Sequence, residues 1–357
     1  MRLKHRDTVL YALGFSSLLF LAAALVLARR PLETKDEMLA ASRRMKEAVK
    51  AVRECRESRD IRIEPAKDIN LTGLIGLETS PITTSLGNLE AKRTTINPNF
   101  AGLITLLLHQ AGVRRGDTVA IGASSSFPAL IIASLCAVQA MELRGLLICS
   151  LGASQWGANH PDFNWLDILA CLNRSDLLSA RPVALSLGGD GDVGKDMSPE
   201  GRDLLLRLGR DTGLAFLSEP DLEKNVRERL RIFETAAGDA GIEAFINIGG
   251  SYANMGTDSK ILKVGTGLAT FSKIPPPERR GVIFEMAARR IPVIHLLYVK
   301  GLCDRYGLPW DPSPLPEPGH GAVYEKKEVD PISFLILAGA YFLLIAIVLA
   351  IAARSGC

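Results

Sequence analysis

The sequence predicts an α/β protein in which a Rossmann-like, three-layer domain with a mostly parallel sheet is flanked by N- and C-terminal transmembrane helices. Over residues 65–307, apolar strand-like runs alternate with helical patterns, and most strands start about 30 residues apart, as βαβ units require. Each end of the 357-residue chain carries a long apolar stretch. With 47% hydrophobic and 23% charged residues, the composition excludes disordered and collagen-like chains.

The two terminal stretches are long enough to cross a bilayer. Residues 8–28 contain 21 residues without a charge and residues 332–353 contain 22, and about 20 span the hydrocarbon core. Cleavage of the first stretch as a signal peptide is the alternative. Its apolar run is longer than a typical signal-peptide core, so we expect a retained span.

The charges beside these stretches predict their orientation. Arg2, Lys4 and Arg6 precede the first stretch and Arg354 follows the second. Because basic flanks stay in the cytoplasm, we expect both termini to be cytoplasmic and the domain between them to lie outside the cytoplasmic membrane. The basic pair at residues 29–30, on the far side of the first stretch, opposes this orientation.

Residues 34–60 are predicted to form a juxtamembrane amphipathic helix. Thr34 and Glu37 have the spacing of a capping box at its start. Its simplest role is a stalk, and a role at the membrane surface or in oligomerisation is the alternative. The residues that share its apolar face are Met38, Met45, Val49 and Val52.

The α/β domain is expected over residues 65–307. Its strand-like runs are continuously apolar, which suits a parallel sheet covered on both faces. Five prolines between residues 308 and 318 predict that residues 308–330 are an extended linker. The predicted strands are 71–77, 118–121, 146–150, 183–187, 215–217, 244–248 and 293–297, and the predicted helices are 99–111, 128–141, 164–172, 199–211, 221–237 and 280–290.

The six cysteines show neither a CxxC motif nor metal-ligand spacing. Cys136 lies in a helical pattern and Cys149 in a strand pattern, so both are expected to be small buried apolar residues. A domain outside the cytoplasm permits one disulfide, whose pairing the sequence does not reveal. The five histidines form no metal-binding pair, and we expect neither a metal nor a cofactor.

Polar, glycine-rich segments follow four of the predicted strands, at residues 79–87, 122–126, 150–159 and 249–251. Ligands bind at the carboxyl ends of parallel strands, and hydroxyls and backbone N–H groups there form anion sites. Helix capping and chain turns explain any one of these loops better than ligand binding does, whereas four at one edge support a shared cleft equally well. The candidate ligand-binding residues are Thr83, Thr84, Lys92, Arg93, Ser124, Ser125, Ser126, Ser154, Gln155, Trp156, Asn159, Gly249 and Gly250.

Two motifs suggest nucleotide or hydrolase chemistry and are weak. Residues 189–195 fit GxxxxGK, but Asp196 replaces the Ser or Thr that holds magnesium, and two aspartates inside the loop would repel phosphate. We therefore expect a solvated turn rather than a nucleotide or calcium site. Residues 122–126 precede a helix as a nucleophile elbow does, but lack the second glycine of GxSxG.

Three motifs in the polar loops carry a family resemblance. They are Ser80-Pro-Ile-Thr-Thr84; Leu89-Glu-Ala-Lys-Arg-Thr94 with residues 97–100 (Asn-Pro-Asn-Phe); and Gly152-Ala-Ser-Gln-Trp-Gly-Ala-Asn159 followed by residues 161–163 (Pro-Asp-Phe). With the terminal spans, they resemble the membrane-anchored poly-γ-glutamate system protein family over roughly residues 70–300. The stretch around Gln155 is the most specific.

The resemblance implies a part in poly-γ-glutamate synthesis and export, beside membrane-embedded synthase subunits. It implies no catalytic residues. Residues 31–330 contain 36 Lys and Arg against 38 Asp and Glu. This balance argues against a broad basic surface and against nucleic acid as a partner, and it favours a narrow site for the anionic polymer.

Three functions stay open at this point. The first is a non-catalytic component, anchored in the bilayer, that binds or guides poly-γ-glutamate outside the membrane. The second is a hydrolase or transferase acting on the γ-glutamyl polymer, with Ser124 or Ser125 as nucleophile and His160 as base. The third is a structural organiser of the synthase complex.

Overall fold

The computed structural model describes residues 5–27, 29–32, 34–175, 177–178, 180–327 and 331–355. The chain forms two units. One comprises Thr34–Val323, and the other combines the two ends of the chain, Met1–Glu33 and Tyr324–Cys357.

The Thr34–Val323 unit is built on a seven-stranded sheet with the strand order β7-β6-β3-β2-β8-β10-β9. Six strands run parallel, and β9 at the edge pairs antiparallel with β10. The predicted α/β fold with a mostly parallel, Rossmann-like sheet is therefore confirmed. The strands are β2 (Thr118–Ser124), β3 (Arg144–Ser150), β6 (Ala184–Ser186), β7 (Ala215–Leu217), β8 (Ala244–Ile248), β9 (Gly267–Leu268) and β10 (Val293–Leu296).

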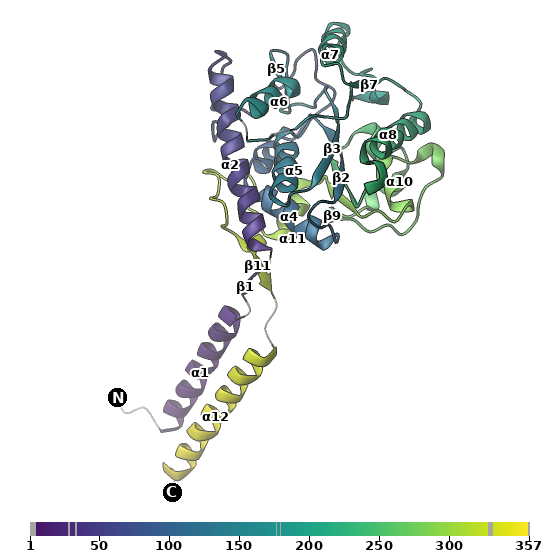
Figure 1. Cartoon of the computed structure of the whole chain (residues 1–357). Helices are drawn as coiled ribbons and strands as arrows, with labels where there is room; N and C mark the ends of the chain where they lie inside the picture. Colours follow the sequence, from purple (N-terminus) through teal and green to yellow (C-terminus); the bar gives the residue numbers. More distant parts are fainter. Residues whose placement is uncertain are drawn as a thin grey trace. The chain divides into compact units, whose positions relative to one another are not determined.

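Helices cover both faces of this sheet (Figure 1). On one side lie α2 (Lys35–Glu57), α4 (Asn99–Gln110) and α5 (Pro128–Ala140), and on the other lie α8 (Leu222–Ala237) and α10 (Val282–Ala288). Helix α5 is buried almost all round because it is apolar on every side, whereas α8 buries one stripe. The remaining elements are α3 (Leu89–Thr95), α6 (Trp165–Arg174), α7 (Pro199–Asp211), α9 (Tyr252–Met255), α11 (Val299–Tyr306), and the β4–β5 pair (Asn159–His160 and Phe163–Asn164).

Helix α2 is an integral part of this unit. Its predicted apolar face is correct, since Met38, Met45 and Val52 are fully buried, and the face packs on α4 and α5. The expected stalk is therefore wrong, because a helix buried in the domain cannot act as a free spacer. The predicted capping box is also wrong, because the Thr34 hydroxyl donates to the Met38 sulfur at 3.4 Å instead of capping a backbone N–H.

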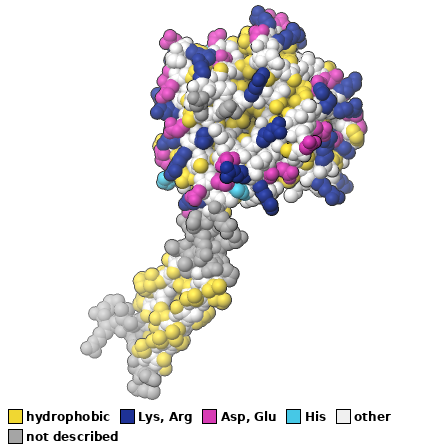
Figure 2. Space-filling model, in the orientation of Figure 1, with side chains coloured by type: hydrophobic (Ala, Val, Ile, Leu, Met, Phe, Trp, Pro, Cys, Tyr) yellow, Lys and Arg dark blue, Asp and Glu magenta, His cyan; other side chains and the backbone are white. Residues whose placement is uncertain are grey.

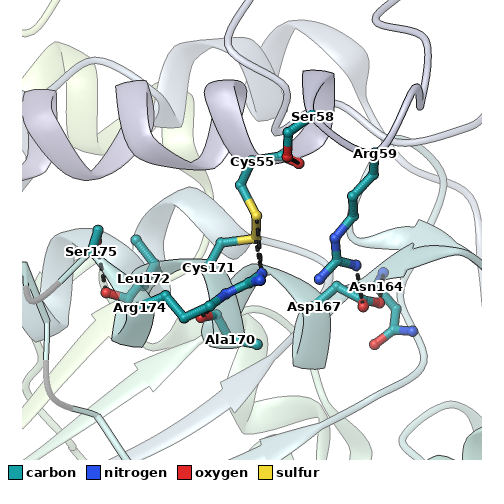
Figure 3. Close-up of a disulfide and its surroundings, with 10 residues drawn as sticks. All are labelled: Cys55, Ser58, Arg59, Asn164, Asp167, Ala170, Cys171, Leu172, Arg174 and Ser175. Carbon is teal, nitrogen blue, oxygen red and sulfur yellow. Dashed lines mark hydrogen bonds and ion pairs between the residues drawn. A yellow bond between two sulfur atoms is a disulfide. The ribbon is translucent and has the colours of Figure 1, made fainter.

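A disulfide joins α2 to α6 (Figure 3). Cys55 near the end of α2 bonds to Cys171 in α6, with Cα atoms 6.0 Å apart and a sequence separation of 116. Beside it, Arg59 pairs with Asp167 at 2.6 Å. Cys136 and Cys149 are free and buried, as the sequence predicted.

The predicted strand at residues 71–77 is wrong. Leu71 and Gly73 have φ values of 50° and 76°, which an extended strand does not contain. The backbone finds other partners: the Leu77 N–H donates to the Asn159 side chain at 2.8 Å, and the Gly73 N–H to the Asp68 carboxylate at 2.7 Å. The segment is a loop held by side chains.

The proline-rich segment lies against the same unit over residues 308–323. Asp311 pairs with Arg93 of α3, with 2.7 Å between Nε and Oδ1. The Asn99 amide of α4 donates to the Glu317 carbonyl at 3.1 Å. These contacts attach the predicted linker to α3 and α4 over that range.

The other unit pairs the two ends of the chain. Helix α1 (His5–Leu27) and helix α12 (Pro331–Ser355) pack side by side, and β1 (Arg29–Pro31) pairs antiparallel with β11 (Glu325–Lys327). Ser17 and Tyr341 share a hydrogen bond of 2.6 Å between the two helices. Residues 332–351 of α12 are long and apolar enough to span a membrane, whereas the apolar stretch found in α1, Val9–Ala24, is shorter.

Candidate functional site

The strand order places a crevice between β2 and β8. From β2 the chain builds β3, β6 and β7 outward on one side, then returns to place β8 on the other side of β2. Ligands of open α/β sheets bind at such a switch point, beyond the carboxyl ends of the strands. A cavity of about 540 Å³ lies here, lined by the residues that follow β2, β3 and β8 together with α3 and the loop before it.

Six of the thirteen predicted ligand-binding residues line this cavity. They come from separate loops, as expected for polar segments that meet at one edge of the sheet. The six are Thr84, Lys92, Ser124, Ser126, Ser154 and Gly250.

Four other predicted residues hold the loops in place. Ser125 is buried, and its hydroxyl donates to the Ser150 carbonyl. The Asn159 amide bonds the backbone of Leu77 and, at 2.9 Å, the Thr83 hydroxyl. The Gln155 side-chain oxygen accepts from the backbone N–H of residue 87 at 3.1 Å. These side chains shape the cavity without lining it.

The remaining three predicted residues lie outside the lining as well. Arg93 points to Asp311, as described above. Trp156 lies under Lys67, whose Nζ is 5.0 Å from the ring centroid. Gly249 has φ 79°, a conformation that favours glycine, and it turns the chain after β8.

Lys92 is the basic side chain of the cavity lining. It projects from α3, is only 4% exposed, and its Nζ donates to the Ser154 hydroxyl at 2.8 Å and to the Ser126 carbonyl. The ammonium also lies 3.8 Å from the centroid of the Phe127 ring. Burial lowers the pKa of Lys92 to about 7, because a charged amine loses its hydration here. Its contacts within the described residues include no carboxylate.

The serines around Lys92 form a hydrogen-bonded chain. The Ser124 hydroxyl donates to Ser126 Oγ at 2.9 Å, and Ser126 Oγ also accepts the backbone N–H of Ser154 at 2.9 Å. Ser150, at the end of β3, lines the same cavity and is 2% exposed. Its hydroxyl has no hydrogen-bond partner in the described structure, although buried polar groups are normally paired.

One acidic side chain faces the same cavity. Asp196 belongs to the segment predicted to be a solvated turn, and burial is the largest cause that raises the pKa of its carboxyl group. The predicted turn is exposed to solvent at Asp190 and Asp196, but the prediction is wrong for Asp192, which is 1% exposed and pairs with Arg229. An internal ion pair and a cavity residue thus occupy the segment that resembles a P-loop.

The histidine proposed as a base is not part of this cavity. His160 lies in β4, where its Nδ1 accepts the backbone N–H of Asp162 at 3.1 Å. Burial is the largest cause that lowers the pKa of His160. The structure gives no contact between His160 and Ser124 or Ser125 among the described residues, so the expected serine–histidine pair is wrong.

Four lining residues that matter for chemistry are absent from the thirteen candidates: Phe127, Ser150, Asp196 and Tyr252. Ser150 had a readable signal, because it is the last residue of a predicted strand. Asp196 also had one, since it follows the next strand of the sheet. No sequence pattern around Phe127 or Tyr252 distinguishes them from other residues at the start of a helix.

Comparison of the chain with protein-family models, with curated proteins and with solved structures finds no match.

Proposed function

We propose that this protein is a membrane-anchored accessory component of poly-γ-glutamate synthesis and export. Its α/β domain binds the polymer outside the cytoplasmic membrane, in the cavity between β2 and β8, and its terminal helices associate with membrane-embedded synthase subunits. One observation carries the binding role. Lys92 is a buried cation without a carboxylate partner in the described structure, in a cavity lined by hydroxyl groups.

The chemistry of the polymer matches this cavity. Poly-γ-glutamate carries one free carboxylate per residue, and a carboxylate is the natural partner of an ammonium group with hydroxyl donors beside it. The surface charge favours binding in a narrow site and not on a broad basic surface. Basic and acidic side chains are interspersed over the visible face of the Thr34–Val323 unit (Figure 2). We therefore propose that a chain end or a short stretch of polymer enters the cavity.

Two features support the location. A disulfide between α2 and α6 suits an oxidising compartment outside the cytoplasm. Helices α1 and α12 pack side by side, and β1, which follows α1, pairs antiparallel with β11, which precedes α12. We propose that both cross the cytoplasmic membrane, with both termini in the cytoplasm.

Replacing Lys92 by Met tests the binding role. The full-length protein in detergent micelles should bind poly-γ-glutamate of defined length, and Lys92→Met should weaken binding about 10- to 100-fold, the cost of one charge-assisted hydrogen bond. Lys50→Met, a change in an exposed side chain of α2, is the matched control and should bind like wild type. Equal affinity of Lys92→Met and wild type, measured by calorimetry, would contradict the proposal.

Binding should also weaken as the pH rises. The polymer's carboxylates are ionised above about pH 5, so between pH 6 and 8.5 the change comes from the protein. Lys92 has a pKa of about 7 and binds a carboxylate in its protonated form. Above pH 7 each binding event must take up a proton, and the dissociation constant should rise by up to about tenfold per pH unit. Calorimetry at constant ionic strength measures this slope, and a flat profile would remove Lys92 from the binding site.

A further inference from the structure

Lys92 and Ser154 form a pair that polymer binding alone does not require. Lys92 Nζ and Ser154 Oγ are 2.8 Å apart, although their sequence separation is 62. Both side chains line the switch-point cavity, and both are largely shielded from bulk solvent, at 4% and 6% exposure. A lysine amine in hydrogen-bond contact with a serine hydroxyl has the geometry of a nucleophile and its general base.

We propose that Ser154 is a catalytic nucleophile and Lys92 its general base, and that the cavity cleaves or transfers the acyl group of an amide. This assignment replaces Ser124 and Ser125 as the nucleophile. Ser125 is buried with its hydroxyl on the Ser150 carbonyl, and Ser124 donates its hydroxyl to Ser126. Neither of these two serines has a base within the contacts of the described residues.

The surroundings of Lys92 suit a neutral amine. The ammonium donates to Ser154 Oγ. In the neutral amine, the two N–H groups keep the Ser126 carbonyl and the face of the Phe127 ring as acceptors, and the nitrogen lone pair can accept the Ser154 O–H, which reverses that hydrogen bond. A base works best when its pKa lies near the working pH. Burial supplies this condition, since it lowers the pKa of Lys92 to about 7.

The reaction balances with water as the second substrate. Ser154 Oγ attacks the amide carbonyl carbon while its proton moves to Lys92 Nζ. The C–N bond then breaks, and Lys92 donates this proton to the departing amine. The acyl group remains bound to Ser154 as an ester. Water attacks the ester, Lys92 takes a proton from the water and passes it to Ser154 Oγ, and the product is a carboxylic acid. An amine in place of water gives acyl transfer.

The negative charge that develops on the carbonyl oxygen needs a donor. The Ser150 hydroxyl lines the cavity without a partner in the described structure, so it can donate to this oxygen without breaking an existing bond. Losing one such donor typically costs about 10²–10³ in rate. We expect Ser150→Ala to slow the reaction by a factor in this range.

Lys92 has two roles in the proposed reaction, one in each protonation state. Protonated Lys92 holds a carboxylate, which is the product of amide cleavage, and neutral Lys92 accepts the Ser154 proton. The nucleophile and its base do not depend on the proposed polymer function; only the γ-glutamyl identity of the acyl group rests on it. The pH profiles distinguish polymer binding from catalysis. Binding weakens above pH 7, whereas the reactivity of Ser154 rises toward pH 7 and levels off above it.

A fluorophosphonate probe on the full-length protein in detergent tests the pair directly. The probe forms a P–O bond to an activated serine and loses fluoride, and peptide mass spectrometry identifies the labelled residue. We expect labelling at Ser154, with a rate that rises up to tenfold per pH unit below about pH 7 and then levels off. Ser154→Ala should lose this label, and Ser58→Ala, an exposed serine at the end of α2, should keep it.

The variant Lys92→Arg distinguishes the role of Lys92 as a general base from its role as a positive charge. Arginine keeps the cation but does not act as a base at neutral pH, so we expect labelling at Ser154 to fall at least 100-fold. The unfolding midpoint of each variant, followed by tryptophan fluorescence, identifies a misfolded protein, and the wild-type pH profile tests the base independently. No label on Ser154 in folded wild type, or a labelling rate that is flat from pH 5.5 to 8.5, would overturn the pair.

A γ-glutamyl oligomer of defined length identifies the acyl group. Shortening or transfer of the oligomer by wild type, lost in Ser154→Ala, supports a γ-glutamyl substrate. Labelled Ser154 with an intact oligomer overturns that substrate while keeping the nucleophile. Polymer binding without any label at Ser154 overturns the catalytic proposal and keeps the binding function.

Discussion

Replacing Arg229 by Met should lower the free energy of unfolding by about 3–5 kcal/mol, because it leaves the carboxylate of Asp192 buried without its cation. Both side chains of this pair are almost completely buried, at 3% and 1% exposure. The Asp192 carboxylate also accepts from Ser186 at 2.9 Å and from Asn225 at 3.0 Å. These neutral donors hold Asp192 in place but do not neutralise it.

The double variant Asp192→Asn, Arg229→Met should lose less stability than Arg229→Met alone, since the uncompensated charge is then absent. Arg227→Met in the same helix removes an exposed pair with Glu223 and should change stability by less than about 1 kcal/mol. Denaturant unfolding followed by tryptophan fluorescence measures these changes, because all three tryptophans lie in the Thr34–Val323 unit. A loss below 1 kcal/mol in Arg229→Met would contradict the internal ion pair.

Removing the disulfide should cost about 2–5 kcal/mol, with most of the effect on the unfolded chain. The bond between Cys55 and Cys171 closes a loop over a sequence separation of 116, so breaking it frees a long segment of unfolded chain. Helix α2 still packs on α4 and α5 without the bond. We therefore expect the Cys55→Ser variant to fold and to unfold at lower denaturant concentration.

A reducing agent gives the matched control for this prediction. It should lower the unfolding midpoint of the wild type to that of Cys55→Ser, and it should leave the variant unchanged. Cys136, Cys149 and Cys303 are free and buried, so the reducing agent has no other disulfide to break among the described residues. An identical midpoint for oxidised and reduced wild type would contradict the disulfide.

Much of the fold could be predicted from local patterns. Strands β7 and β8 and helix α7 have the bounds expected from the sequence, because short apolar runs between turn residues and an amphipathic helix after Ser198 are local signals. The prediction of a strand at residues 71–77 failed because contacts with other segments decide the conformation there. The apolar residues of this loop resemble a strand, but its hydrogen bonds go to Asp68 and to Asn159, and the latter lies 82 residues away from Leu77.

The sequence predicts which loops form the site, but it does not predict which of their side chains enter the cavity. Polar loops after parallel strands meet at one edge of a sheet, so the sequence identifies Lys92 and the serines as candidates. Which of them point inward depends on α3, a seven-residue helix with no strong pattern. Lys92 enters the cavity from it, whereas its neighbour Arg93 turns away to Asp311.

The pairing of β1 with β11 also has a consequence for how the chain is made. A ribosome adds about 5–20 residues per second, so the roughly 300 residues between the two strands take about 15 to 60 s to synthesise. Throughout this interval β1 lacks its partner strand, and Ser17 of α1 lacks Tyr341. The contacts that α1 and β1 make with α12 and β11 can therefore form only after the whole α/β domain has been synthesised.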